Sequence, residues 1–207
     1  RLQQAGYRTA LIGKWHLKKE PAGFDYYSVF HDQGTYRDPV FKTAENWMDD
    51  DKGVGGAVEK GFSTDLVTDK AIRWIKERDR TKPFSMFCHF KATHEPCDFP
   101  ERFAHLYDGV RFPEPENLLE FGPAKSGRTF AGQPLETMAW RWNKAYTDPE
   151  NWWTYYPELP FCGVEGDSVA NRRAIYQKLV RDYLRCAAAI DDNIGRLLRT
   201  LDEEGLA

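Results

Sequence analysis

The chain has 207 residues, of which 41% are hydrophobic and 29% charged, and its formal net charge at pH 7 is -3. This length and apolar content can bury one sizeable core, which excludes a disordered chain. Because Lys and Arg are spread evenly, nothing indicates a nucleic acid as partner, and no run of about 18 apolar residues predicts a membrane span.

The first elements predicted along the chain are the end of a helix and a strand. Residues 1–5 are typical of a last helical turn, with Gly6 as its C-cap. Residues 7–12 (YRTALI) form a short apolar run, which predicts a strand covered on both faces of a parallel sheet. Because no initiator Met precedes Arg1, we expect an N-terminal truncation.

An irregular segment, a helix and a second strand are predicted next. Residues 21–61 are rich in glycine and acidic turns, and we expect loops there with at most a short hairpin or meander. Apolar residues at helical spacing predict a helix that Ser63 or Thr64 caps and that runs to about Asp79. Residues 84–90 (FSMFCHF) predict a strand that again ends in polar residues.

The rest of the chain divides into an irregular stretch and one long helix. Residues 97–167 contain many prolines and four tryptophans and show little periodicity, so we expect a surface insertion there. An apolar stripe at helical spacing predicts a helix over residues 168–204, which Gly205 ends. This order of elements predicts an α/β fold with ligands beyond the carboxyl ends of its strands.

Two polar residues after the first predicted strand are candidates for a site. Extended backbone would place Lys14 and His16 on one face, with Trp15 on the other. An ammonium group beside an imidazole suits an oxyanion, because the first neutralises charge and the second handles a proton. A solvated lysine and a surface histidine remain the alternative on these residues alone. A phosphate-binding P-loop does not fit, since six residues rather than four separate Gly6 from Gly13.

The cysteines and their histidine neighbours have a simpler interpretation than a metal site. Cys88, His89, His94 and Cys97 could be drawn as a zinc site, but Cys88 and His89 would point to opposite faces of a strand. A small buried residue is the better interpretation of Cys88. The chain has four cysteines, which are too few for a disulfide framework at this length.

Three stretches of the sequence resemble a known family. Residues 6–17 (GYRTALIGKWHL) resemble the second signature of the sulfatases, a formylglycine-dependent family of the alkaline-phosphatase-like superfamily. Residues 82–96 (KPFSMFCHFKATHEP) resemble the family's strand that leads into a His-x-Pro element, and residues 183–207 resemble the helix before its C-terminal metal motif. The patterns GFDYY and DQGTYRDPVF are similar to the branch that includes N-acetylglucosamine-6-sulfatases.

The resemblance implies roles for three residues of this chain. It implies that Lys14 contacts sulfate oxygens, that His16 supports an aldehyde-hydrate nucleophile, and that His94 binds sulfate and protonates the leaving alcohol. The family makes its nucleophile in a Cys/Ser-x-Pro-x-Arg motif, which these 207 residues lack. We therefore expect the nucleophile and the carboxylates that bind the family's calcium to lie outside this sequence, with no metal ligand within it.

The resemblance also implies the fold, the activity and the location of the parent protein. Residues 1–207 would form the central portion of one sulfatase catalytic domain, with an insertion at about residues 97–167. The domain would have a sheet with helices on both faces, and its N- and C-terminal parts would be missing. The parent would be an exported sulfuric ester hydrolase (periplasmic, extracellular or lysosomal) that removes sulfate from a sulfated carbohydrate of glycosaminoglycan or mucin type. The isolated chain would be inactive.

Two alternatives to that function remain open at this stage. Related folds hydrolyse phosphate or phosphonate monoesters, and the upstream nucleophile and metal ligands would separate this class from the sulfatases. A relative that binds a sugar or an anion without catalysis is the other alternative, and an upstream region without the nucleophile motif would favour it.

Overall fold

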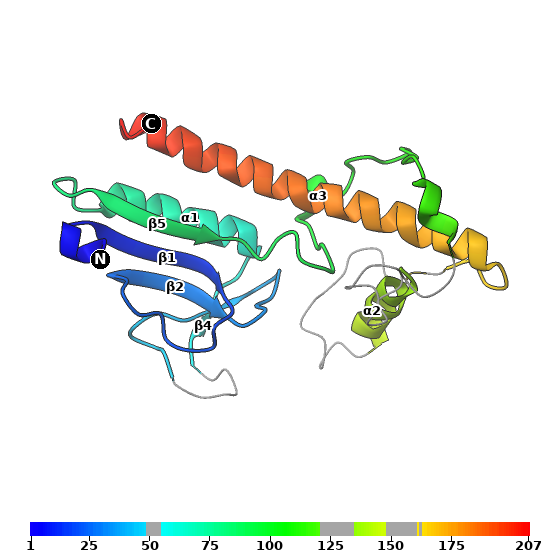
Figure 1. Ribbon diagram of the computed structural model, residues 1–207, viewed down its shortest axis with the longest axis horizontal. Helices are drawn as coiled ribbons and strands as arrows, with labels where there is room; N and C mark the ends of the chain where they lie inside the picture. Colours follow the sequence, from blue (N-terminus) through cyan, green and yellow to red (C-terminus); the bar gives the residue numbers. More distant parts are fainter. Residues whose placement is uncertain (49–54, 121–134, 148–160, 162) are drawn as a thin grey trace. The chain divides into compact units, whose positions relative to one another are not determined.

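The computed structural model describes residues 1–48, 55–120, 135–147, 161 and 163–207 (Figure 1). The chain divides into two units, which are described separately below. Unit 1 comprises residues 1–92 and 189–207, and unit 2 comprises residues 93–188.

A parallel three-stranded sheet is the centre of unit 1. The strand β1 (Arg8–Trp15) lies between β2 (Tyr26–His31) and β5 (Phe84–His89). At the middle of β1, Leu11 and Ile12 are fully buried, as expected for a central strand that is covered on both faces. Because all three strands are parallel, their carboxyl ends lie at the same edge of the sheet.

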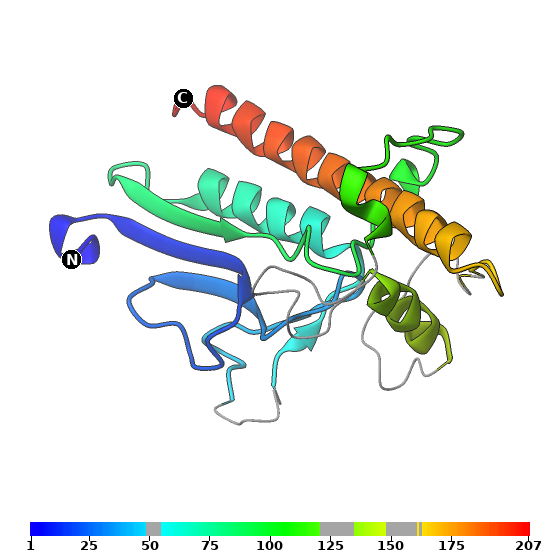
Figure 2. The ribbon, with the colours of Figure 1, turned by 45° about the vertical axis from the view of Figure 1, so that its right-hand side comes forward.

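Different elements cover the two faces of this sheet. The helix α1 (Ser63–Glu77) packs Val67 and Ala71 against Ile12 and Phe30 on one face. The C-terminal part of α3 lies alongside α1 (Figure 2), where Asn193 Nδ2 donates a hydrogen bond of 2.8 Å to Asp65 Oδ1. On the other face a second cluster contains three buried sheet residues and three partly buried aromatic residues, namely Leu11, Tyr27, Val29, Trp15, Phe24 and Trp47.

The two strands predicted on either side of α1 are confirmed, but the first is longer than expected. The apolar run of residues 7–12 becomes β1, which continues through Lys14 to Trp15. The prediction of loops over residues 21–61 is wrong for β2, and the short antiparallel pair β3 (Val40–Phe41) and β4 (Ala57–Val58) is the hairpin-like part. The sequence before β2 contains no hairpin turn that would reveal the strand. This is because β2 pairs in parallel with β1, and parallel neighbours are joined by a longer connection.

The N-terminus of α1 differs from the prediction of a side-chain cap. Neither Ser63 nor Thr64 caps the helix, and both are buried. Instead, the backbone N–H of Ser63 donates a hydrogen bond of 2.7 Å to the Tyr36 carbonyl oxygen. A contact with a distant segment thus supplies the partner that a capping hydroxyl would otherwise provide.

The long predicted helix is confirmed as α3 (Ser168–Glu203). At its start, the Ala170 N–H donates to Asp167 Oδ1 at 2.9 Å, and at its end the Leu206 N–H donates to the Leu201 carbonyl at 2.8 Å. Gly205 adopts a φ of 68°, as the predicted C-cap requires. None of the helices in the described part of the chain is long and apolar enough to cross a membrane.

Unit 2 contains a helix that the sequence analysis did not predict. The helix α2 (Glu136–Thr147) lies within the stretch expected to be irregular, which also holds the short 3-10 helices Glu101–Phe103 and Glu116–Leu119. Fully buried Trp142 packs against Ile175 of α3. Helical spacing links Trp142 to Met138, but this stripe is short and prolines flank it. Two of the other tryptophans in this stretch, at positions 152 and 153, lie outside the described residues.

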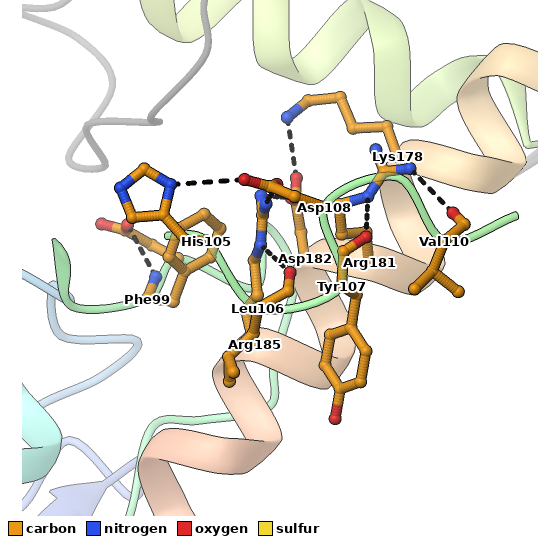
Figure 3. Close-up of polar contacts among 11 residues, drawn as sticks. Phe99, His105, Leu106, Tyr107, Asp108, Val110, Lys178, Arg181, Asp182 and Arg185 are labelled. Carbon is orange, nitrogen blue, oxygen red and sulfur yellow. Dashed lines mark hydrogen bonds and ion pairs between the residues drawn. The ribbon is translucent and has the colours of Figure 1, made fainter. Parts of the chain in front are cut away.

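Buried charges fasten the segment before α2 to α3 (Figure 3). Arg185 is fully buried and donates to the Leu106 carbonyl at 3.0 Å and to Asp108 Oδ1 at 2.8 Å. Buried Asp182 accepts a hydrogen bond of 2.8 Å from Lys178, one turn earlier in the same helix. Removing one partner would leave a buried charge uncompensated, so breaking these contacts is costly. The contacts of Arg185 therefore hold Leu106 and Asp108 against α3.

Candidate functional site

Gly13 fixes the geometry of β1 just before the candidate site begins. Its φ is 104°, and a Cβ atom there would lie 1.9 Å from the carbonyl oxygen of His89, its neighbour in register on β5. Only glycine tolerates both this backbone angle and this close approach. The backbone of Lys14, the next residue, therefore starts from a position that the pairing of two strands defines.

The two predicted site residues at the carboxyl end of β1 are held by adjacent residues that follow β2. The ammonium group of Lys14 donates a hydrogen bond of 2.8 Å to Gln33 Oε1. His16 lies in the turn after β1, and its Nε2 atom is 3.0 Å from Asp32 Oδ1. The other oxygen of the same carboxylate is 3.0 Å from Nζ of Lys18. The structure thus brings Lys14 and His16 to one edge of the sheet and gives each a polar partner.

The end of β5 contributes two more basic residues to this edge. Nζ of Lys91 donates a hydrogen bond of 2.9 Å to the backbone carbonyl of Gln33 and lies 5.2 Å from the centre of the Tyr36 ring. Lys91 is 3% exposed. Nδ1 of His89 is 3.3 Å from the Lys14 carbonyl oxygen. The ends of all three strands are therefore connected by hydrogen bonds.

Sequence reasoning missed three residues that organise this edge, namely Asp32, Gln33 and Lys91. Lys91 carried a usable signal, because it follows a predicted strand directly and ligands gather at that end of a parallel sheet. Asp32 and Gln33 carried none, since the strand that they follow was itself expected to be a loop. The named contacts hold the ammonium groups of Lys14 and Lys91 on Gln33 and that of Lys18 on the neighbouring Asp32, so three ammonium groups and one carboxylate meet at this edge. This excess of positive charge favours an anionic ligand.

The third predicted site residue, His94, belongs to unit 2. Nδ1 of His94 lies 2.6 Å from the carbonyl oxygen of Glu95 and 3.4 Å from Glu95 Oε2. Arg141 of α2 donates a hydrogen bond to the Glu95 carboxylate. Burial alone would raise the pKa of Glu95, but His94 and Arg141 outweigh it, so this pKa lies below its usual value. The Glu95 carboxylate therefore stays charged between a histidine and an arginine.

Cys88 and His89 take opposite faces of β5, as the argument against zinc expected. Cys88 packs in the core cluster with Ile12, whereas His89 is exposed and its ring contacts that of Phe87. Burial raises the pKa of the Cys88 thiol to about 12, so this thiol is neutral at physiological pH. Within the described ranges, no three His, Cys, Asp or Glu side chains come close enough to hold a metal ion.

Comparisons with known proteins identify relatives over the whole chain. The profile of the sulfatase family matches residues 1–207. An N-acetylglucosamine-6-O-sulfatase from Bacteroides thetaiotaomicron is 37% identical over 234 aligned positions, which cover 99% of this chain and 40% of that protein. A solved structure of a protein in complex with its substrate D-glucosamine-2-N,6-O-disulfate is 34% identical, with a TM-score of 0.76, and the match covers 99% of this chain and 46% of that one.

A further solved structure shares the fold alone. It concerns the metabolism of multiple glycosaminoglycans by Bacteroides thetaiotaomicron, and it is 18% identical with a TM-score of 0.56 over 99% of this chain and 38% of that chain. The α/β fold with a parallel sheet, expected from the sequence, is confirmed by these matches. The chain spans 40% of the length of the curated relative and 46% of the solved one.

Proposed function

The chain belongs to the sulfatase family. We propose that its lysines at the carboxyl end of the sheet, Lys14, Lys18 and Lys91, form the positively charged side of a site that hydrolyses a sulfate ester on a sugar. Because the chain spans 40% of its curated relative, the activity is proposed for the complete protein that contains it. In that reaction water replaces the sugar oxygen on sulfur, which releases inorganic sulfate and a free sugar hydroxyl group.

The observation that carries this proposal is the fixed ammonium group of Lys14 at the carboxyl end of β1. Negative charge spreads over the oxygens of a transferring sulfuryl group, and a positioned cation lowers the energy of that state. Gln33 holds the ammonium through a neutral oxygen at 2.8 Å, so this hydrogen bond leaves its positive charge in place. Asp32 orients the ring of His16 two residues further on, which makes it a group that can support the nucleophile.

His94 is proposed as the acid that protonates the leaving sugar oxygen. A carbonyl oxygen only accepts hydrogen bonds, so the 2.6 Å contact with Glu95 places a proton on Nδ1 of the imidazole. The other ring nitrogen, Nε2, is then the atom from which the imidazolium donates to a leaving alkoxide. An alkoxide of a sugar is a poor leaving group, so a positioned acid accelerates its departure.

The proposed substrate is a carbohydrate sulfated on the 6-oxygen of glucosamine. One relative is named for activity on N-acetylglucosamine 6-sulfate, and the solved relative has D-glucosamine-2-N,6-O-disulfate as its substrate. A glucosamine derivative that carries sulfate on its 6-oxygen is thus named for both relatives. We propose that the enzyme acts outside the cytoplasm, where sulfated carbohydrate polymers are encountered. We also propose that residues 1–207 belong to one catalytic domain.

Calcium and formylglycine complete the site in the family that this chain resembles. Calcium would neutralise the sulfate group when bound, and carboxylate oxygens are its ligands. The part of the chain that the structure describes has no group of three such side chains that could hold a metal ion. The residues present therefore do not fit a calcium site, and the roles of Lys14, His16 and His94 are derived without it.

The test measures sulfate release by the complete protein, expressed from its full reading frame. N-acetylglucosamine 6-sulfate is compared with the 6-phosphate of the same sugar, and inorganic sulfate and phosphate are quantified separately. The proposal predicts turnover of the sulfate ester with a kcat/KM at least about 100-fold above that of the phosphate ester. Preference for the phosphate ester would instead support a phosphate monoester hydrolase, and turnover of neither would contradict the enzyme assignment.

A further inference from the structure

The turn that follows β2, residues 32–34, packs closely against the core of unit 1. Asp32 and Gly34 both have positive φ angles, of 56° and 58°. A Cβ atom on Gly34 would lie 2.2 Å from Cδ2 of Phe30, which is a buried residue of the core cluster. The chain therefore folds back closely on Phe30, and the position of Gln33 between these two residues is set by the core.

Gln33 uses both of its carbonyl oxygens to connect two strands. Its backbone oxygen accepts a hydrogen bond of 2.9 Å from Lys91, which follows β5. Its side-chain oxygen accepts a hydrogen bond of 2.8 Å from Lys14 on β1. Lys91 is 3% exposed, so this lysine anchors the backbone of Gln33 from inside the protein. The anchored backbone then directs the amide group toward Lys14.

We propose that Gln33 is a positioning residue, which sets where the ammonium group of Lys14 meets the anionic group of the substrate. This inference rests on the proposed function, in which Lys14 contacts a sulfate oxygen. An ammonium group has three N–H donors, and the bond to Gln33 fixes the direction of one of them and thereby of the others. A lysine on a flexible stem would otherwise lose side-chain entropy each time it binds an anion.

The chemistry of the amide explains why this position carries glutamine rather than glutamate. A carboxylate would hold Lys14 at least as tightly, because it would add the attraction of opposite charges to the hydrogen bond. It would also add a negative charge beside the site and repel a sulfate ester. The neutral oxygen of Gln33 provides the position without the repulsion, which distinguishes a positioning role from simple packing.

Three variants of the complete protein test this inference. Gln33→Met keeps the length of the side chain and removes the acceptor, and Gln33→Glu keeps the acceptor and adds a charge. The matched control is Gln3→Met, because Gln3 is exposed at the other end of β1, where its Nε2 donates to Asp25 Oδ1 at 3.1 Å. For each variant, kcat and KM for N-acetylglucosamine 6-sulfate, the inhibition constant of inorganic sulfate and the melting temperature are measured.

The variants have distinct expected results. Gln33→Met lowers kcat/KM about tenfold, as expected for the loss of one hydrogen bond to a charged group. Gln33→Glu raises KM and the inhibition constant of sulfate by at least about tenfold, since the added carboxylate opposes anion binding. Gln3→Met leaves all three kinetic quantities unchanged. Wild-type kinetics in both Gln33 variants would overturn the inference, as would equal losses in both that follow a lowered melting temperature.

A direct binding measurement separates this inference from the proposed function. If the wild-type protein releases no sulfate, the proposed function fails, and calorimetric titration with inorganic sulfate then tests Gln33. Weaker sulfate binding in Gln33→Glu than in wild type and Gln3→Met supports the positioning role. Equal affinities in all three proteins, or no binding to wild type, would overturn it.

Discussion

Replacing Gly13 with alanine tests the strand geometry that places the candidate site. At a φ of 104° any side chain is strained, and the new Cβ atom would lie 1.9 Å from the His89 carbonyl oxygen. This is about 1.1 Å inside the 3.0 Å that Cβ atoms keep from other heavy atoms. The contact is with backbone, so neither partner can rotate away, and β1 and β5 must separate at this point.

Three contributions set the expected loss of stability for Gly13→Ala. A side chain at a positive φ costs about 1–2 kcal/mol, and an overpacked interior contact adds about 1–3 kcal/mol. Separation of the strands also weakens a backbone hydrogen bond, worth about 1 kcal/mol. We expect the free energy of unfolding to fall by about 3–6 kcal/mol in total. The measurement is urea denaturation of the complete protein at 25 °C, followed by circular dichroism.

Gly6→Ala is the matched control for this experiment. Gly6 has a φ of 86°, but a Cβ atom there would have no heavy atom within 4 Å. The control therefore carries the backbone strain alone and should lose about 1–2 kcal/mol. A loss for Gly13→Ala that equals the loss for Gly6→Ala would refute the close approach of β1 and β5 at His89.

Three further predictions concern catalysis, acid stability and thiol reactivity. His94→Gln should lower kcat for sulfate release by about 100-fold or more, since it removes the proposed acid, whereas His105→Gln, at a side chain that is 91% exposed, should not; equal rates in the two variants would count against the role of His94. The backbone N–H of Thr9 lowers the pKa of Asp25 below 3.8, so its stabilisation is present above about pH 4 and is lost as the pH falls through the folded-state pKa. Asp25→Asn should accordingly be less stable than wild type in urea at pH 7, and this difference should shrink toward pH 3; a difference independent of pH would exclude the linkage. Burial raises the pKa of Cys88 to about 12, so mass spectrometry should find this cysteine unmodified by N-ethylmaleimide at pH 7 in the folded protein and modified in urea; rapid modification of the folded protein would show that β5 is more open than described.

The elements that the sequence predicted correctly are those with a long or fully buried apolar pattern. The stripe of α3 extends over many turns, β1 contains the fully buried run of residues 10–12 at the centre of the sheet, and β5 at its edge is mostly apolar. Such patterns follow directly from burial, and they need no knowledge of distant contacts. Lys14 and His16 were found for the same reason, because they follow the apolar run of residues 7–12.

The parts that the sequence did not predict depend on tertiary contacts. The strand β2 forms by pairing with β1. Because the sequence analysis did not predict β2, it also did not identify Asp32 and Gln33, which follow this strand, as site residues. The helix α2 is short and is stabilised by the burial of Trp142, so Arg141, the partner of Glu95, was not considered for the site. In both cases the missing information is which surface a short segment packs against.

The most direct test of the central claim replaces the ammonium group of Lys14 in the complete protein. Lys14→Met is compared with wild type and with Lys60→Met, whose side chain is 83% exposed and pairs with Asp38. Initial rates of sulfate release from N-acetylglucosamine 6-sulfate are measured over a range of substrate concentrations, which gives kcat/KM. We predict that Lys14→Met lowers kcat/KM by about three powers of ten or more while Lys60→Met retains wild-type activity. Near-wild-type turnover by Lys14→Met would contradict the assignment of Lys14 to the site.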